Sequence, residues 1–132
     1  MRLFIVTVNK SEDGKVIVTG KTSIGDFKGI WKSKDVPLVN EDYDVELTLP
    51  LLSRDSVKIE EPHLSAQSML DLNERLYLRG KCEIIDEDDI YIMRFDTNWI
   101  EMLEIEHNEI KVNDIISLMV PIDQVEIYPV SW

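Results

Sequence analysis

Two histidines and one cysteine are among the residues of this sequence that could act as a nucleophile, a general base or a metal ligand. A thiolate is a nucleophile, and a neutral imidazole accepts a proton or binds a metal ion. Cys82 alternates with Leu76 and Leu78, so we expect a buried, unreactive thiol. His63 and His107 lie in polar stretches beside glutamates, at spacings that match no catalytic or metal-binding motif. We therefore predict a non-enzymatic protein that holds no metal ion and no cofactor.

The acidic run Asp86-Glu87-Asp88-Asp89 carries enough oxygen atoms to suggest a calcium or magnesium site. Calcium loops, however, place their ligands at alternate positions and include a glycine for the sharp turn. Four adjacent carboxylates between two apolar runs point in several directions, so the pattern indicates a solvated hairpin turn.

A second cluster combines aromatic and basic residues. On a strand, Phe27 and Trp31 share one face, whereas Lys28 and Lys32 share the other. Small barrels that bind single-stranded nucleic acid place aromatic and cationic side chains on the same exposed face. The separation therefore favours core aromatics and solvated lysines, and a nucleic-acid site is the alternative. That alternative site comprises Lys15, Lys21, Lys28, Lys32, Phe27 and Trp31.

The elements that position these residues show a period of two. Val45, Leu47 and Leu49 alternate with Glu46 and Thr48, as in a strand with one buried face. Similar runs recur with turn signals between them, of which Asp13-Gly14 is the strongest. The pattern predicts an all-β protein, an OB-like small barrel or sandwich of about ten short antiparallel strands. The predicted strands are Leu3–Val8, Lys15–Thr22, Phe27–Lys32, Tyr43–Leu49, Val57–Glu60, Arg75–Ile85, Ile90–Phe95, Trp99–Ile105, Ile115–Val120 and Val125–Tyr128.

Two segments depart from simple alternation. Good helix formers between Ser65 and Asn73 predict one short helix, capped by Ser65. In Trp99–Ile105, Ile100 and Met102 occupy one face while Leu103 and Ile105 occupy the other. Either both faces of this strand are covered, or a β-bulge shifts its register; we favour the bulge.

The two halves of the chain share short patterns. Thr19-Gly20-Lys21 matches Arg79-Gly80-Lys81, and the segment 44–50 matches 114–121 in its alternation and its final proline. These matches suggest an internal duplication with five strands in each half. The alternative is that short β-strands resemble one another without common origin.

Length and charge bound the class of protein. The chain has 132 residues, 26 Asp and Glu against 14 Lys and Arg, and a net charge of −12. This length fits a single β-barrel-like domain over residues 1–132. One cysteine excludes an intrachain disulfide, so we expect a reducing, cytoplasmic location. The sequence lacks a signal peptide and any apolar run approaching about 20 residues, so we expect no membrane association.

The charge is unevenly distributed along the chain. Residues 1–34 carry seven Lys and Arg against three Asp and Glu, whereas residues 35–132 carry seven against 23. The electrostatic field of an acidic surface attracts a basic protein partner and accelerates its docking. Exposed aromatic side chains commonly anchor such contacts. The net charge disfavours nucleic acid as the partner. The predicted partner-binding residues are Asp86, Glu87, Asp88, Asp89, Tyr91, Trp99, Glu101, Glu104 and Trp132.

Two stretches carry a resemblance to a class of proteins. One is Gly25–Trp31 followed by Tyr43–Leu47, and the other is Gly80–Asp89 followed by Asn113–Leu118 and Glu126–Pro129. They resemble the small acidic all-β immunity proteins encoded beside bacterial polymorphic toxins. The resemblance implies a cytoplasmic binding protein that neutralises a basic toxin domain. A single-stranded nucleic-acid-binding domain that uses residues 1–34, or a structural module of a larger assembly, remains an alternative, and the oligomeric state is open.

Overall fold

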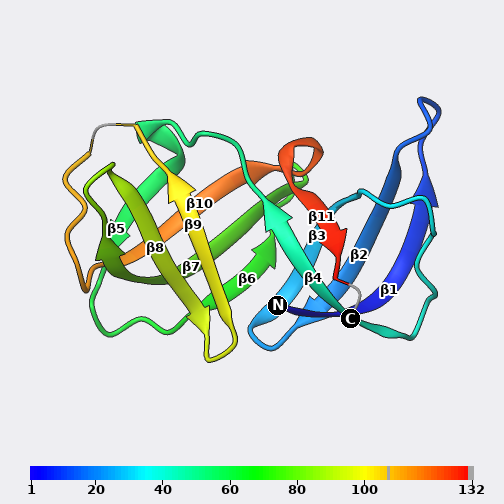
Figure 1. Cartoon of the computed structure of the whole chain (residues 1–132), viewed down its shortest axis with the longest axis horizontal. Coiled ribbons are helices and arrows are strands. Elements are labelled where there is room, and N and C mark those ends of the chain that lie inside the picture. The colour runs from blue at the N-terminus through cyan, green and yellow to red at the C-terminus, as the bar shows by residue number, and fades with distance from the viewer. Residues whose placement is uncertain (107, 131–132) are drawn as a thin grey trace.

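A computed structural model describes residues 1–106 and 108–130. These residues form eleven strands and two short 3₁₀ helices, which confirms the predicted all-β class. The longest axis of the molecule is horizontal in Figure 1, where two lobes lie side by side. The strands are β1 (Arg2–Lys10), β2 (Val16–Thr22), β3 (Gly25–Trp31), β4 (Asp42–Thr48), β5 (Val57–Glu60), β6 (Gln67–Leu70), β7 (Arg75–Ile85), β8 (Ile90–Asp96), β9 (Trp99–Glu104), β10 (Ile115–Pro121) and β11 (Glu126–Pro129), with 3₁₀ helices η1 (Arg54–Ser56) and η2 (Ile122–Gln124).

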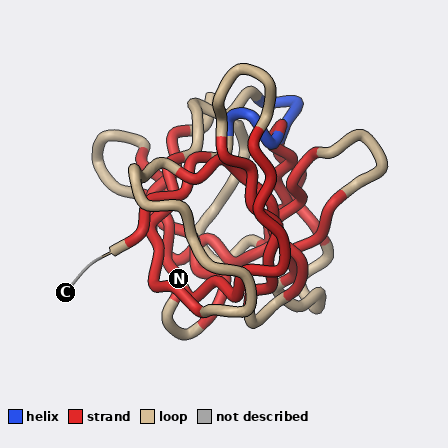
Figure 2. The backbone as a smooth tube through the Cα atoms, turned by 90° about the vertical axis from the view of Figure 1, so that its right-hand side faces the viewer, coloured by secondary structure: helices blue, strands red, loops and turns tan. Residues whose placement is uncertain are grey.

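The first barrel consists of β1, β2, β3, β11 and β4, paired in that order around a closed ring. All of these pairs are antiparallel except β3–β11, which is parallel. Gly14, with a φ of 85°, allows the tight turn between β1 and β2 that Asp13-Gly14 predicts. Figure 2 views the molecule from the side of this barrel and shows the strands running round a closed ring.

The second barrel consists of β7, β8, β9, the segment from Leu52 through β5, and β10. Its ring closes where Leu52 pairs in parallel with Ile105, just beyond β9. The pairing order matches that of the first barrel: each has three successive antiparallel strands, and in each the third strand runs parallel to the fifth. A register shift also occurs in both first strands, between Ile5 and Thr7 in β1 and between Cys82 and Ile84 in β7.

The fifth strands are exchanged between the two barrels. The chain leaves β4 of the first barrel and enters the second barrel at Leu52, and it leaves β10 of the second barrel and enters the first as β11. Most of the buried apolar residues of both barrels form one cluster. Trp99 of β9 joins them, because its ring packs on Phe27 of β3 and on Phe95 of β8 at centroid distances of 6.1 and 5.1 Å.

The topology relates β1–β4 to β7–β10. The predicted match between segments 44–50 and 114–121 therefore pairs equivalent strands, β4 and β10. The match between Gly20 and Gly80 does not, because Gly20 lies in the second strand of its barrel and Gly80 in the first strand of the other. Similar tripeptides occur there because both strands need a small residue: a Cβ on either glycine would lie within 2.6 Å of a neighbouring strand's carbonyl oxygen.

Two sequence predictions about local structure are wrong. No helix forms at Ser65–Asn73; Gln67–Leu70 is strand β6, because pairing with β7 and β3 outweighs a weak helix propensity. The bulge expected in β9 lies instead in its partner β8, between Arg94 and Asp96. Ile100 and Met102 consequently stay on the outer face of a regular strand. No helix of the described residues is long and apolar enough to cross a membrane.

Candidate functional site

The hairpin turn between β7 and β8 gathers the predicted acidic run at one end of the second barrel. The Asp86 carboxylate holds this turn, since its Oδ1 accepts hydrogen bonds from the backbone N–H groups of Asp88 (2.8 Å) and Ile90 (3.0 Å). Asp89 adopts a left-handed φ of 58°, and all four acidic side chains are exposed. The described residues contain no group of three or more side chains that could hold a metal ion.

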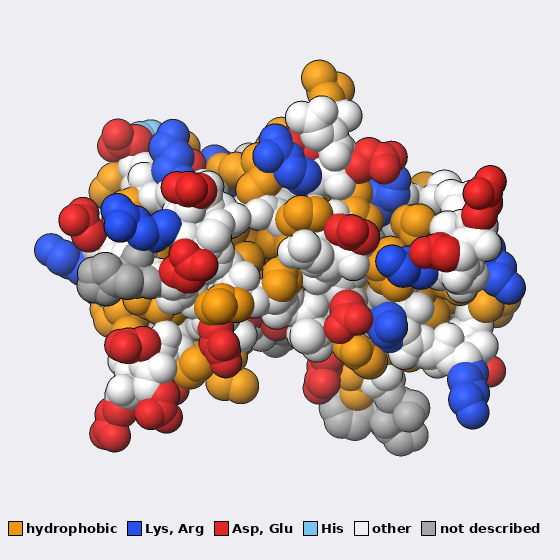
Figure 3. All heavy atoms as spheres, turned by 90° about the horizontal axis from the view of Figure 1, so that it is seen from above, with side chains coloured by type: hydrophobic (Ala, Val, Ile, Leu, Met, Phe, Trp, Pro, Cys, Tyr) orange, Lys and Arg blue, Asp and Glu red, His pale blue; other side chains and the backbone are white. Residues whose placement is uncertain are grey.

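Strand pairing adds further carboxylates to this turn. Ile90 at the start of β8 lies opposite Glu104 at the end of β9, and the exposed Glu106 follows two residues later. The structure therefore brings together predicted residues that are distant in sequence. We call this surface the acidic end, comprising Asp86, Glu87, Asp88, Asp89, Glu104 and Glu106. On the face shown in Figure 3, carboxylates protrude at the lower left, on the second barrel.

The aromatic residues predicted to anchor a partner are not on the surface. Tyr91 is 7% exposed and Trp99 is 3% exposed, so both belong to the core and their predicted role as contact anchors is wrong. The reason is the alternation of β8 and β9, which points both rings inward. Trp132, the third predicted anchor, lies outside the described residues.

Glu101 has an unusual environment for a carboxylate. It lies on the same strand face as the buried Trp99 and Leu103, and its Oε1 accepts a hydrogen bond from the Trp99 indole N–H (3.0 Å). Burial raises the pKa of Glu101 to about 7, although the Trp99 hydrogen bond and the Met1 amino group lower it. The nearby Glu46 raises it further. This carboxyl group can therefore change charge near neutral pH.

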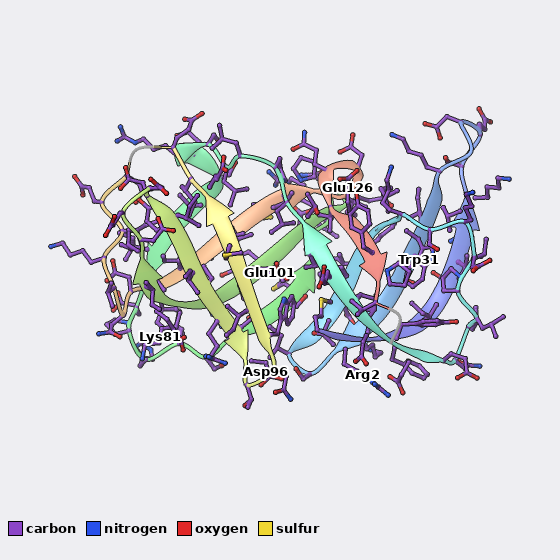
Figure 4. The ribbon with its side chains drawn as sticks, viewed as in Figure 1. Arg2, Trp31, Lys81, Asp96, Glu101 and Glu126 are labelled. Atoms are coloured by element: carbon purple, nitrogen blue, oxygen red, sulfur yellow. The ribbon has the colours of Figure 1, made fainter. Side chains whose placement is uncertain are left out.

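Glu101 lies in a groove between the two barrels. Figure 4 places it between β9 and β4. The groove has a volume of about 600 Å³, and its walls combine apolar side chains with two carboxylates. We call it the inter-barrel groove; the residues that matter below are Met1, Glu46, Leu47, Ile100, Glu101 and Met102. Apart from Glu101, the sequence analysis did not predict these residues as part of a site. The sequence feature that could have indicated them is the pair of apolar residues, Ile100 and Met102, on the outer face of β9.

The alternative nucleic-acid site is not assembled as an exposed surface. Phe27 and Trp31 are buried, and the Trp31 indole N–H donates to the carbonyl oxygen of Asp35 (2.8 Å). All four lysines of that site form ion pairs with carboxylates, so their charge is locally compensated. The pairs are Lys15–Asp13 (3.7 Å), Lys21–Asp26 (3.0 Å), Lys28–Glu74 (3.0 Å) and Lys32–Glu126 (3.7 Å).

The potential nucleophile and bases are separated. Cys82 is buried in β7, and burial raises the pKa of its thiol, with a further contribution from Asp114. His63 is exposed in the loop between β5 and β6, and His107 lies outside the described residues. No hydrogen bond joins Cys82 to a histidine within the described part of the chain.

Comparisons with protein families, with curated proteins and with solved structures give no match for this chain.

Proposed function

We propose that this chain is a non-enzymatic binding protein whose acidic end docks a basic protein partner, a toxin domain that it neutralises. The observation that carries the proposal is the acidic end itself. It joins the Asp86–Asp89 turn to Glu104 through the pairing of β8 with β9, so charges from separate parts of the chain act together.

The wider charge distribution supports this choice of surface. Residues 50–121, which supply most of the second barrel, contain 16 Asp and Glu against seven Lys and Arg. Several of those cations are already compensated, as in the pairs Arg75–Asp71 and Arg94–Glu83. The second barrel therefore carries most of the negative charge.

The nature of the partner follows from charge complementarity. An enzyme that grips nucleic-acid phosphates must present Lys and Arg, and an inhibitor that covers these residues benefits from an opposite field. Such a field raises association rates by about 10- to 1,000-fold at low ionic strength. The resemblance to immunity proteins points the same way. The compensated lysines of the first barrel make nucleic-acid binding the weaker alternative.

The test begins with a tagged chain cross-linked in its native cells, from which a basic partner is identified and purified. The partner's association rate is then measured with a variant carrying Asp86→Asn, Glu87→Gln, Asp88→Asn and Asp89→Asn. The asparagine side chain introduced by Asp86→Asn keeps an acceptor oxygen for the turn, so we expect the hairpin to persist. A control variant neutralises four exposed carboxylates of the first barrel, through Glu12→Gln, Asp35→Asn, Glu41→Gln and Asp42→Asn.

We expect the acidic-end variant to associate about tenfold more slowly at low salt, and the difference from wild type to disappear in high salt. The control variant changes total charge equally, so it should slow association by less than about twofold. Equal effects of the two variants, or a salt-independent wild-type rate, would contradict docking by the acidic end.

A further inference from the structure

The two barrels meet along two junctions, and a strand fills one of them. At the filled junction, β6 pairs in parallel with the beginning of β3 and antiparallel with β7. The Ser68 backbone N–H donates to the Ile24 carbonyl (3.0 Å), and the Ser68 hydroxyl donates to the Asp26 carbonyl. The first residues of β3 are thus hydrogen-bonded to β6, and the last residues of the same strand pair with β11.

The equivalent edge in the second barrel is that of β9, the third strand of its ring. The carbonyl of Glu104 accepts a hydrogen bond from the Leu52 N–H at 2.9 Å. Alternate residues of a strand direct their backbone groups to the same edge, so Ile100 and Met102 share the edge used by Glu104. Within the described residues, β9 has only β8 as a paired strand, so the Ile100 and Met102 backbone groups face the inter-barrel groove unpaired.

The opposite wall of the groove is also a strand edge. The Val45 N–H of β4 donates to the Met1 carbonyl (2.8 Å), so Leu47 directs its backbone groups to that same edge, just beyond β1. The chain continues from β4 to Leu52, which forms a parallel bridge with Ile105 just after β9. Strands β4 and β9 therefore run in the same direction, and the distance between them increases away from this bridge. Figure 1 shows β4 and β9 side by side with their arrows pointing the same way.

The side chains around this open edge favour a particular occupant. Ile100 is 47% exposed and Met102 is 74% exposed, so the groove has apolar surface that a β-strand residue could cover. Between them in sequence, Glu101 turns to the inner side, with Glu46 of β4 near it. Backbone groups, apolar walls and two carboxylates together match an extended peptide that carries a cation.

We propose that the inter-barrel groove binds an extended segment of a protein partner, which adds to β9 as a strand and directs a Lys or Arg side chain to Glu101. The segment would occupy the position in this junction that β6 occupies in the other. The inference rests on the proposed function for the basic character of the partner, and it adds a contact distinct from the acidic end.

A cation in the groove makes this binding pH-dependent. The groups that face Glu101 are the carboxylate of Glu46, the Met1 amino group and the Trp99 indole N–H. Because burial holds the pKa of Glu101 near 7, part of the population is neutral at physiological pH. A bound ammonium or guanidinium group favours the carboxylate, so binding releases a proton and strengthens as the pH rises from 6 to 8.

The probe is the synthetic peptide acetyl-Thr-Val-Lys-Val-Thr-Val-amide, titrated into the isotope-labelled chain and followed by amide NMR. Two control peptides replace Lys with Glu or carry N-methyl groups on alternate backbone nitrogens, which blocks strand pairing. Two variants of the chain complete the design. Met102→Pro removes a backbone N–H of β9 that pairs with no other strand, and Glu101→Gln removes the charge. The matched control is Glu12→Gln, which removes an exposed carboxylate in the turn between β1 and β2.

We expect shifts at Ile100 and Met102, loss of binding with Met102→Pro and with the N-methylated peptide, and about tenfold weaker binding with Glu101→Gln. Glu12→Gln should change the affinity less than twofold. If Met102→Pro proves unfolded, the N-methylated peptide still decides whether strand pairing is needed. Undiminished binding of that peptide, or no binding of any probe, overturns the inference. A basic partner that still docks through the acidic end then leaves the proposed function intact.

Discussion

Replacing Glu101 with glutamine should stabilise the protein in a pH-dependent manner. Glutamine has nearly the same shape and keeps an oxygen that can accept the Trp99 indole hydrogen bond, which is 3.0 Å long in the wild type. The substitution removes the ability to ionise and replaces one carboxyl oxygen with an NH₂ group, which does not titrate. Any difference in pH dependence between the two proteins therefore reports on the Glu101 carboxyl group.

The size of the effect follows from the two pKa values of this group. Burial raises the pKa of Glu101 to about 7 in the folded protein, against an ordinary value of 4.5. At 1.36 kcal/mol per pKa unit, the difference corresponds to an upper limit of about 3 kcal/mol in the free energy of unfolding. The remaining solvent contact of the groove keeps the expected value below this limit.

The direction is set by proton binding in the two states. Between pH 4.5 and 7 the folded state holds the Glu101 proton more tightly than the unfolded chain, so its contribution to stability falls as the pH rises. Below pH 4.5 both states are protonated and the wild type and Glu101→Gln should be similarly stable. Above pH 7 the wild type carries a buried charge, and the variant should be more stable by about 1–3 kcal/mol.

The measurement is urea unfolding of both proteins at intervals from pH 4.5 to 8.5. The other carboxylates also change stability with pH, so the quantity of interest is the difference between the two proteins. Glu104→Gln, on the exposed face of the same strand, controls for loss of one negative charge. A difference that stays constant across the range, or one that Glu104→Gln reproduces, would refute the inference of a buried carboxyl that titrates near pH 7.

Three other results are expected. Gly25→Ala should destabilise the protein by about 2–4 kcal/mol in thermal unfolding, because Gly25 has a φ of 140° and a Cβ there would lie 1.9 Å from the Ser68 carbonyl oxygen. Gly14→Ala, with a φ of 85° but no atom within 4 Å, should cost only about 1 kcal/mol, and equal losses would contradict this reasoning. Cys82 should react with a disulfide reagent about 100-fold more slowly in the native protein than in denaturant; equal rates would show that the thiol is accessible. A fluorescent oligothymidylate at low salt should show no saturable anisotropy change below about 100 μM, and tighter, salt-sensitive binding would revive the nucleic-acid alternative.

Local sequence patterns predict strands and turns well in this protein because each strand carries its own alternation. The run around Val45 and Leu47 forms β4, and Asp13-Gly14 forms a turn with the positive φ that it predicts. The helix prediction for Gln67–Leu70 is wrong for a physical reason. Its residues have a weak helix propensity, but its backbone pairs with β7 and β3, and no local pattern contains these contacts between distant residues.

The candidate site shows the same division between local and distant information. The acidic turn at Asp86–Asp89 could be predicted, and only pairing of β8 with β9 places Glu104 beside it. In β9, Glu101 shares a strand face with the buried Trp99 and Leu103, whereas the sequence analysis placed it among the acids that contact a partner. The sequence suggested a single exposed cluster of acidic residues. Only the groove between β4 and β9 shows that Glu101 differs from the other carboxylates in its burial and its raised pKa.

The exchange of fifth strands explains both the hidden repeat and the open groove. Each half of the chain supplies four strands of one barrel and completes the other barrel, so the repeat is interrupted at Leu52 and at β11. After this exchange, the two junctions between the barrels lie in different parts of the chain, so a strand can occupy one junction and not the other. The connection from β5 to β7 supplies β6 to one junction, whereas in the other β4 is hydrogen-bonded to β1 at Val45 and its edge at Leu47 faces the groove. An unpaired strand edge favours aggregation unless something protects it. Here the half-buried, ionisable Glu101 lies on the strand that carries this edge, and under our proposal it favours a cationic strand over a second apolar one.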